Sequence, residues 1–149
     1  MTRYGLDVTI VHPPGFDIDP EVVGWCKKNA EESGGHLRIS NDYSEALNGA
    51  HAVFPRSWVS QECVMRGLGD FGAESELAIH EKHKDWTLTQ KQVDCMDKHA
   101  VIMHVMPVYR GMEAADEVID GEHSAIIDQA ENRLYAQMAV LTLTMSERP

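Results

Sequence analysis

The chain lacks the features that direct a protein to a membrane or to nucleic acid. None of its apolar runs approaches the roughly 20 residues that a membrane-spanning helix needs. Basic residues are few: 13 Lys and Arg stand against 24 Asp and Glu, which gives a net charge of −11 at pH 7. So acidic a chain repels phosphate backbones and anionic lipid, and we expect neither nucleic acid nor a membrane surface as a partner.

Cysteine is also scarce. Cys26, Cys63 and Cys95 are odd in number and far apart, which favours buried thiols in a reducing compartment over disulfides. The first residues lack the apolar segment of a signal peptide, and we expect a cytoplasmic protein. The 149 residues, 43% of them hydrophobic, suit one domain with a sizeable core.

What the chain does contain is an alternation of short β-branched runs with helical patterns. The pattern predicts strands at residues 6–12, 37–40, 52–54, 100–104 and 124–128, and helices at 20–33, 44–47, 73–82, 89–97 and from about 130. Strands separated by helices indicate a parallel sheet covered on both faces. The predicted fold is a doubly wound, Rossmann-like α/β domain of three layers, with a mainly parallel five-stranded sheet spanning residues 1–149 as a single domain.

Local signals refine these elements. Asp19 and Pro20 predict the start of the first long helix and Gly34 its end, with Val22, Val23, Cys26 and Ala30 facing inward. The run 100–104 has no polar alternation, so both its faces should be buried. The last helix carries a stripe of large apolar residues: Leu134, Met138, Leu141 and Met145.

Two motifs carry little functional information. Residues 67–72 match the G-x-G-x-x-G dinucleotide pattern, but no strand directly precedes them, so a flexible glycine loop is favoured. His80 and His83 lie near Glu76 and Glu81 without the spacing of a zinc-protease motif, so a solvated helix face is favoured over a metal site.

Two other segments indicate a ligand site. His104-Val105-Met106-Pro107 ends the fourth predicted strand, and Ala130-Glu131-Asn132-Arg133 follows the fifth. Ligands of open parallel sheets bind outside the carboxyl ends of the strands. Arg133 at a helix N-terminus would attract an anion through both its guanidinium and the helix dipole. The alternative is that Glu131 and Arg133 pair locally and cap the helix.

The segment from His104 to Leu141 resembles the C-terminal half of ornithine and related carbamoyltransferases. Their H-C-L-P motif corresponds to His104–Pro107, with Val105 and Met106 in place of Cys and Leu. The resemblance continues through Arg110-Gly111, residues 116–121, Ser124 and residues 128–137. Residues 12–16 and 48–53 agree more loosely.

The resemblance implies roles for these residues. In the family this half binds the amino acid, and the other half binds carbamoyl phosphate. His104 and Arg133 would be catalytic, with Arg133 stabilising charge on an oxygen of carbamoyl phosphate. The main-chain carbonyls of Val105 and Met106 would orient the carbamoyl group and the amine, and Pro107, Arg110 and Glu131 would contact substrate. No metal or organic cofactor is implied.

The middle of the chain departs from the ornithine enzymes. Ser60 matches a substrate-binding serine, but Arg56 stands where an aspartate would hold the α-amino group. Arg56-Ser57-Trp58, the insertion after them and residues 83–86 look like the knotted branch that acts on N-acylated ornithine. Arg56, Ser57, Trp58 and Ser60 are therefore expected to bind substrate, although Trp58 is equally typical of a core or interface aromatic residue.

The sequence also lacks the Ser-x-Arg-Thr and H-P-x-Q motifs with which the family binds phosphate. We therefore expect the amino-acid-binding half of a carbamoyltransferase of arginine metabolism, inactive alone, that acts on ornithine or an N-acylated relative. Its expected partners are that amino acid, carbamoyl phosphate and a carbamoyl-phosphate-binding half-domain or subunit, in a homo-oligomeric complete enzyme. The alternative is a non-catalytic binding module that kept the fold.

Overall fold

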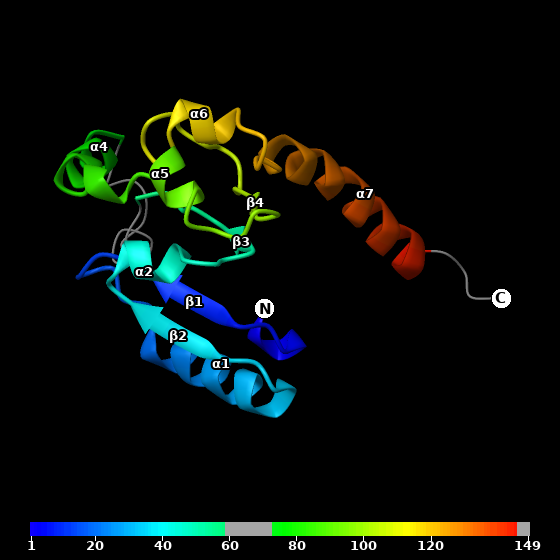
Figure 1. The fold of residues 1–149 in the computed structure, drawn as a ribbon. Helices are drawn as coiled ribbons and strands as arrows, with labels where there is room; N and C mark the ends of the chain where they lie inside the picture. The colour runs from blue at the N-terminus through cyan, green and yellow to red at the C-terminus, as the bar shows by residue number, and fades with distance from the viewer. Residues whose placement is uncertain (59–72, 146–149) are drawn as a thin grey trace. The chain divides into compact units, whose positions relative to one another are not determined.

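A computed structural model describes residues 1–58 and 73–145, except the side chains of 73–77 (Figure 1). The chain divides into two compact units. The first comprises Met1–Asn48 and Trp58–Trp86, and the second comprises Gly49–Ser57 and Thr87–Pro149.

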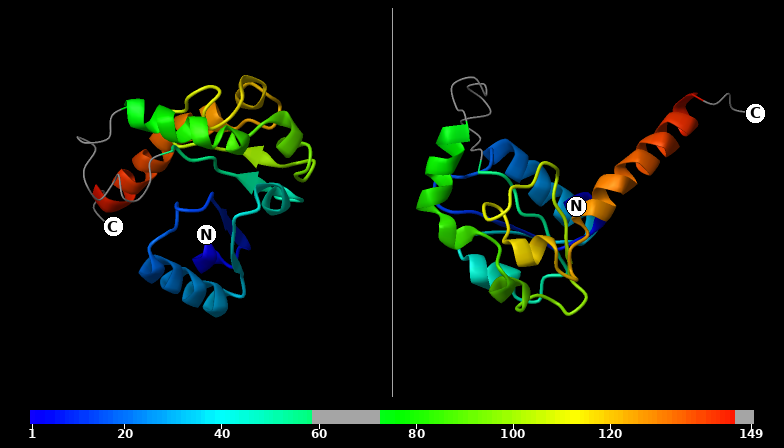
Figure 2. Two further views of the ribbon diagram at one scale, coloured as in Figure 1. Left: turned by 90° about the vertical axis from the view of Figure 1, so that its left-hand side faces the viewer. Right: turned by 90° about the horizontal axis from the view of Figure 1, so that it is seen from above.

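The first unit is built on a parallel β-α-β crossover. β1 (Val8–Val11) pairs in parallel with β2 (Leu37–Ser40), and α1 (Pro20–Ser33) connects them. In Figures 1 and 2, α1 runs along the strand pair and packs on β2 and on the short 3-10 helix η1 (Thr2–Tyr4). The unit is completed by α2 (Tyr43–Leu47), α4 (Ala73–Lys82) and the 3-10 helix η3 (Lys84–Trp86).

The ends of α1 follow the predicted signals. The Asp19 carboxylate accepts the Glu21 N–H at 2.8 Å, which satisfies one of the free donors of the first turn. Gly34 closes the helix at φ 78°, and its N–H bonds to the Ala30 carbonyl. Ala30 is buried as expected, but Val22 is exposed, since a two-stranded sheet and η1 cover only a narrow stripe of the helix.

The second unit holds another parallel pair. β3 (Ala52–Val53) pairs with β4 (Val101–Ile102). Three helices accompany it: α5 (Gln90–Val93), α6 (Asp116–Ile119) and α7 (Ile126–Met145). Its best buried large side chains are Leu88, Ile102, Val118 and Ile126.

The α/β class with parallel strands is confirmed, while the five-stranded sheet is seen only in part. The described strands form two parallel pairs, and Ser124 adds a single parallel bridge to Ile102. The predicted strand at 124–128 is wrong, because the helical bond from the Gln129 N–H to the Ala125 carbonyl already forms at 2.8 Å. Ile126 is 1% exposed and Ile127 is 70% exposed, so only one side of this β-branched run is buried.

Three smaller predictions also fail. The helix predicted at 89–97 ends at Val93, although Thr89 and Gln92 form a capping box at its start. Val101 is exposed, so β4 is not buried on both faces. Cys95 is exposed rather than buried, and Cys63 lies outside the described residues.

The last helix, α7, is unbroken over its 20 residues (Figure 2). Every side chain from Ala130 to Met145 is exposed, including the predicted apolar stripe. Its last eight residues, Met138–Met145, contain no charged side chain. No helix within residues 1–58 and 73–145 is long and apolar enough to cross a membrane.

Candidate functional site

Three chain segments leave the second unit's sheet at one edge. β3 and β4 run in parallel, and the Met103 N–H bonds to the Val53 carbonyl at 3.0 Å. Residues 54–57 and His104–Pro107 therefore both begin at the carboxyl ends of neighbouring strands. On the other side of β4, the Ala125 N–H bonds to the Ile102 carbonyl at 2.8 Å, so α7 also begins at this edge. This is where open parallel sheets place ligands.

His104 is the buried polar residue of this edge. Its side chain is 3% exposed, and neither Nδ1 nor Nε2 has a hydrogen-bond partner among the described residues. A neutral imidazole has one hydrogen-bond donor and one acceptor. Each of them that is buried without a hydrogen bond lowers the stability of the fold by about 1–3 kcal/mol. An imidazole in this state is suited to a ligand that supplies the missing partners.

The rest of the predicted H-C-L-P counterpart is open to solvent. Val105, Met106 and Pro107 are exposed, and the Met106–Pro107 peptide bond is cis. No described residue donates a hydrogen bond to the carbonyl of Val105 or Met106. These two main-chain acceptors are therefore available beside His104.

Arg56 and Ser57 follow β3 at the same edge and are both exposed. Arg56 forms no ion pair with any residue in the part of the chain that the structure describes. Among the described residues, this edge thus carries a cation without an ion-pair partner, one strand away from His104.

Arg133 is not at a helix N-terminus, contrary to the prediction. Because α7 begins at Ile126 rather than near residue 130, Arg133 lies two turns inside the helix, about 10 Å along its axis from the first residue. The helix-dipole part of the expected anion attraction therefore acts near Ile126 and not at Arg133. Glu131 and Arg133 are both exposed, and no ion pair joins them in the described chain.

Arg110 is committed to a structural pair. Its Nη1 and Nη2 donate to the two oxygens of Asp120 at 2.7 and 2.8 Å, and Asp116 lies 3.6 Å away. Hydrogen bonding to the guanidinium lowers the pKa of Asp120, and the same pair raises the pKa of Arg110. We expected Arg110 to bind substrate. Because Asp120 already binds its guanidinium, Arg110 is less free to do so.

Trp58 belongs to the first unit and packs among aromatic rings. Its ring stacks on that of His83, with 5.7 Å between the ring centroids and 6° between the ring planes, and Phe16 lies edge-on to both rings. His80 is buried against the same indole at 5.8 Å. The two histidines thus contact Trp58 rather than forming the solvated helix face that the sequence favoured. Ser60 and the glycine motif at 67–72 lie outside the described residues.

One residue that holds the site's loop was missed. Glu113 is 3% exposed, and its Oε2 accepts the Tyr109 N–H at 2.9 Å, which ties down the segment after Pro107. Its own carbonyl accepts the Leu88 N–H at 3.1 Å. The available signal was an acidic residue set between Met112 and Ala114-Ala115, an apolar context that favours burial.

The described residues contain no group of three or more His, Cys, Asp and Glu side chains placed to hold a metal ion. What the edge offers is an unpartnered buried imidazole, two free carbonyls and an exposed guanidinium. Together these can hydrogen-bond an amide-like group and pair with an anion.

The chain is similar to known carbamoyltransferases over nearly its whole length. The family model for the Asp/Orn-binding domain of aspartate/ornithine carbamoyltransferases matches residues 1–144. Ornithine carbamoyltransferase of Methanothermobacter thermautotrophicus is 37% identical over 143 residues, which is 96% of this chain and 44% of that protein. The anabolic ornithine carbamoyltransferase of Pyrococcus furiosus is 37% identical over 148 residues, or 97% and 43%.

Solved structures give the same result. Ornithine carbamoyltransferase from Pyrococcus furiosus aligns with a TM-score of 0.81 at 34% identity, covering 95% of this chain and 42% of the other. N-acetyl-L-ornithine transcarbamylase aligns with a TM-score of 0.80 at 31% identity, covering 95% and 42%. The chain therefore spans less than half the length of these relatives.

Proposed function

Since the chain belongs to the aspartate/ornithine carbamoyltransferase family and matches its Asp/Orn-binding domain, we propose that residues 1–149 form one amino-acid-binding domain that works with a separate carbamoyl-phosphate-binding half. The proposed reaction transfers a carbamoyl group from carbamoyl phosphate to an amine of ornithine or an N-acylated relative. The observation that carries the proposal is the buried His104 imidazole, unpartnered within the described chain, at the carboxyl end of β4.

The proposed roles of the residues follow from their chemistry. His104 forms a hydrogen bond with the carbamoyl group. The carbonyls of Val105 and Met106 accept hydrogen bonds from the N–H groups of the carbamoyl group and of the incoming amine. Arg133 pairs with an oxygen of carbamoyl phosphate, where a cation stabilises charge that develops in the transition state. Pro107 shapes the loop, and Glu131 and Ser60 contact the substrate.

Arg56, Ser57 and Trp58 select the amino acid in this proposal. An Arg repels a free ammonium and forms a charge-assisted hydrogen bond with a carboxylate or an acyl oxygen, worth about 1.5–3 kcal/mol. The substrate that fits Arg56 is therefore an N-acylated ornithine. Arg110 contributes indirectly by holding the loop through Asp120.

The partner half is the second part of the proposal. The uncharged end of α7, Met138–Met145, is exposed on all sides although six of its eight residues are apolar, and an exposed apolar surface of this kind marks an interaction site. Most of the length of the relatives lies outside the region that this chain matches. We assign the carbamoyl-phosphate-binding half as the surface that covers α7.

The complete enzyme is further proposed to be a homo-oligomer of the cytoplasm. The thiols of Cys26 and Cys95 are free, which supports a reducing compartment. A non-catalytic module is the second candidate, favoured by the absence of both phosphate-binding motifs from the sequence.

Calorimetric titration of the chain joined to a carbamoyl-phosphate-binding half tests the substrate assignment. With carbamoyl phosphate present, N-acetylornithine should bind more tightly than ornithine, and Arg56→Ala should remove that preference. Arg38→Ala is the matched control, because that guanidinium already pairs with Glu45 at 2.9 Å in the other unit. Tighter binding of free ornithine, unchanged by Arg56→Ala, would refute the role of Arg56, and no binding of either compound would favour the non-catalytic module.

A further inference from the structure

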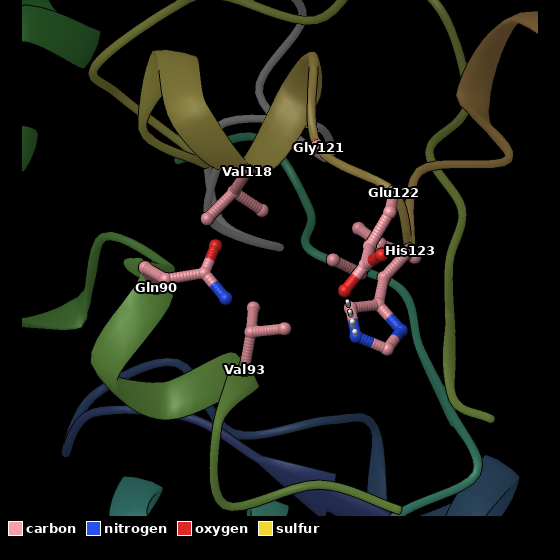
Figure 3. Close-up of a pocket in the computed structure, with 7 residues that line it drawn as sticks. Gln90, Val93, Val118, Gly121, Glu122 and His123 are labelled. Carbon is pink, nitrogen blue, oxygen red and sulfur yellow. Dashed lines mark ion pairs between the residues drawn. The ribbon is translucent and has the colours of Figure 1, made fainter. Parts of the chain in front are cut away.

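A hollow of about 230 Å³ lies in the second unit, away from the edge described above (Figure 3). It is lined by seven residues of α5, β4, α6 and the segment after α6: Gln90, Val93, Ile102, Val118, Gly121, Glu122 and His123. Residues 121–123 precede Ser124, which pairs with Ile102, so the hollow opens at the opposite end of β4 from His104. None of the residues assigned to the proposed carbamoyltransferase site lines it.

The floor of the hollow is apolar and belongs to the core. Val93, Ile102 and Val118 are each 4% exposed or less. At roughly 30 Å³ per water molecule, the volume holds about seven or eight waters, or an organic group of similar size. Apolar walls bind hydrocarbon in preference to water, so the floor suits a small aliphatic group.

The rim offers hydrogen-bond acceptors. His123 Nδ1 lies 2.9 Å from the Ala100 carbonyl, which can only accept, so this nitrogen carries the hydrogen and the neutral ring leaves Nε2 as an acceptor. The Gln90 amide nitrogen donates to Asp94 at 2.8 Å, which leaves the Gln90 carbonyl oxygen for the hollow. A Glu122 oxygen lies 3.8 Å from His123 Nε2 (Figure 3).

We propose that this hollow binds a small primary ammonium ion that carries a hydrocarbon group of about six carbons. An ammonium has three N–H donors and no acceptor, so it can donate to the acceptors of this rim, one of which is charged. The hydrocarbon covers the floor of Val93, Ile102 and Val118. The net charge of −11 favours a cation, and Glu122 repels a carboxylate.

Nuclear magnetic resonance titration of the full chain with cyclohexylammonium chloride tests the proposal. Cyclohexanol and cyclohexanecarboxylate serve as neutral and anionic probes of similar size. Saturable shifts of the amides of Val93, Val118 and Gly121 are expected with the ammonium, with clearly weaker binding of the alcohol and none of the carboxylate. Equal binding of the alcohol, or shifts scattered over the surface without saturation, would overturn the proposal.

Two variants localise the binding. Glu122→Gln removes the charge of an exposed side chain and should weaken cyclohexylammonium binding by about 1.5- to 5-fold, the range of an exposed ion pair. Glu117→Gln changes an exposed carboxylate of α6 outside the hollow and should leave the affinity unchanged. Gln90→Trp, at an exposed position on the rim, should block binding without touching the core. An affinity unchanged by Glu122→Gln, or binding that survives Gln90→Trp, would place the ammonium elsewhere.

Discussion

Arg110 and Asp120 form a two-pronged ion pair, with N–O distances of 2.7 and 2.8 Å, that joins the loop after β4 to the end of α6. Two further contacts hold the same loop: the Tyr109 N–H to Glu113, and the Gly111 N–H to the Ala114 carbonyl at 2.8 Å. These contacts hold in place the loop that follows the His104–Pro107 segment. The role of Arg110 there is structural.

The Arg110–Asp120 pair predicts a pH dependence of stability. The pKa of Asp120 is lowered in the folded chain by the guanidinium, so the pair contributes stability above the unfolded carboxyl pKa of about 4 and loses it as the pH falls through the folded value. Urea unfolding of wild type and Asp120→Asn should differ at pH 7 and converge at about pH 2. A difference that persists in acid would contradict the assignment, and Glu117→Gln, whose carboxylate forms no ion pair in the described chain, is the control.

Glu113→Ala should destabilise the chain by about 1–3 kcal/mol, because it leaves the Tyr109 N–H without its acceptor. Glu113→Gln keeps an oxygen at this position and should cost less. Chemical denaturation measures both, with Glu117→Ala on the exposed face of α6 as the reference. Equal losses for Glu113→Ala and Glu117→Ala would show that this hydrogen bond does not hold the loop.

Leu88→Ala should lower the free energy of unfolding by about 2–5 kcal/mol, because Leu88 is 0% exposed and its removal leaves a cavity. Leu143→Ala makes the same chemical change at a site that is 77% exposed, and should have little effect on the chain alone. Thermal unfolding of the two variants gives the comparison. A larger loss for Leu143→Ala would mean that α7 is covered in the isolated chain.

The partner assignment predicts a different outcome for α7 once the carbamoyl-phosphate-binding half is added. Leu141→Glu places a charge in the exposed apolar stripe and should leave the fold of the chain intact while abolishing association with that half. Glu31→Lys, on exposed α1, is a charge change outside α7 and should not affect association. Analytical ultracentrifugation of the mixtures measures this, and undiminished association of Leu141→Glu would remove α7 from the interface.

Local chemistry was enough to predict the elements whose ends are set by nearby residues. Asp19 and Gly34 bound α1 because caps act over a single turn, and the β3–β4 pairing follows from parallel strands separated by helices. The Ile126-Ile127 run predicts a strand because β-branched residues favour strands. The hydrogen bond from the Gln129 N–H to the Ala125 carbonyl shows that this run is helical instead. Because of that error the prediction placed Arg133 in the first turn of α7, whereas it lies in the third.

The sequence alone does not predict contacts between residues that are far apart in the chain. Nothing in the local pattern shows that Arg110 meets Asp120 rather than substrate, or that His80 and His83 contact Trp58. The exposure of Val101 depends on what lies across β4, which a pattern of apolar residues does not specify. Sequence placed His104 at a strand end, and the structure adds that its buried ring has no partner in the described chain.

Reconstitution of turnover tests whether this chain is the amino-acid-binding half of a carbamoyltransferase. The chain is mixed with the part of Pyrococcus furiosus ornithine carbamoyltransferase that lies outside the matched region, and carbamoyl phosphate consumption is measured with N-acetylornithine or ornithine. We expect no turnover by either part alone, turnover by the mixture, and a large loss in the mixture with Arg133→Ala or His104→Ala. Turnover by the chain alone, or turnover of the mixture that is indifferent to both substitutions, would contradict this expectation.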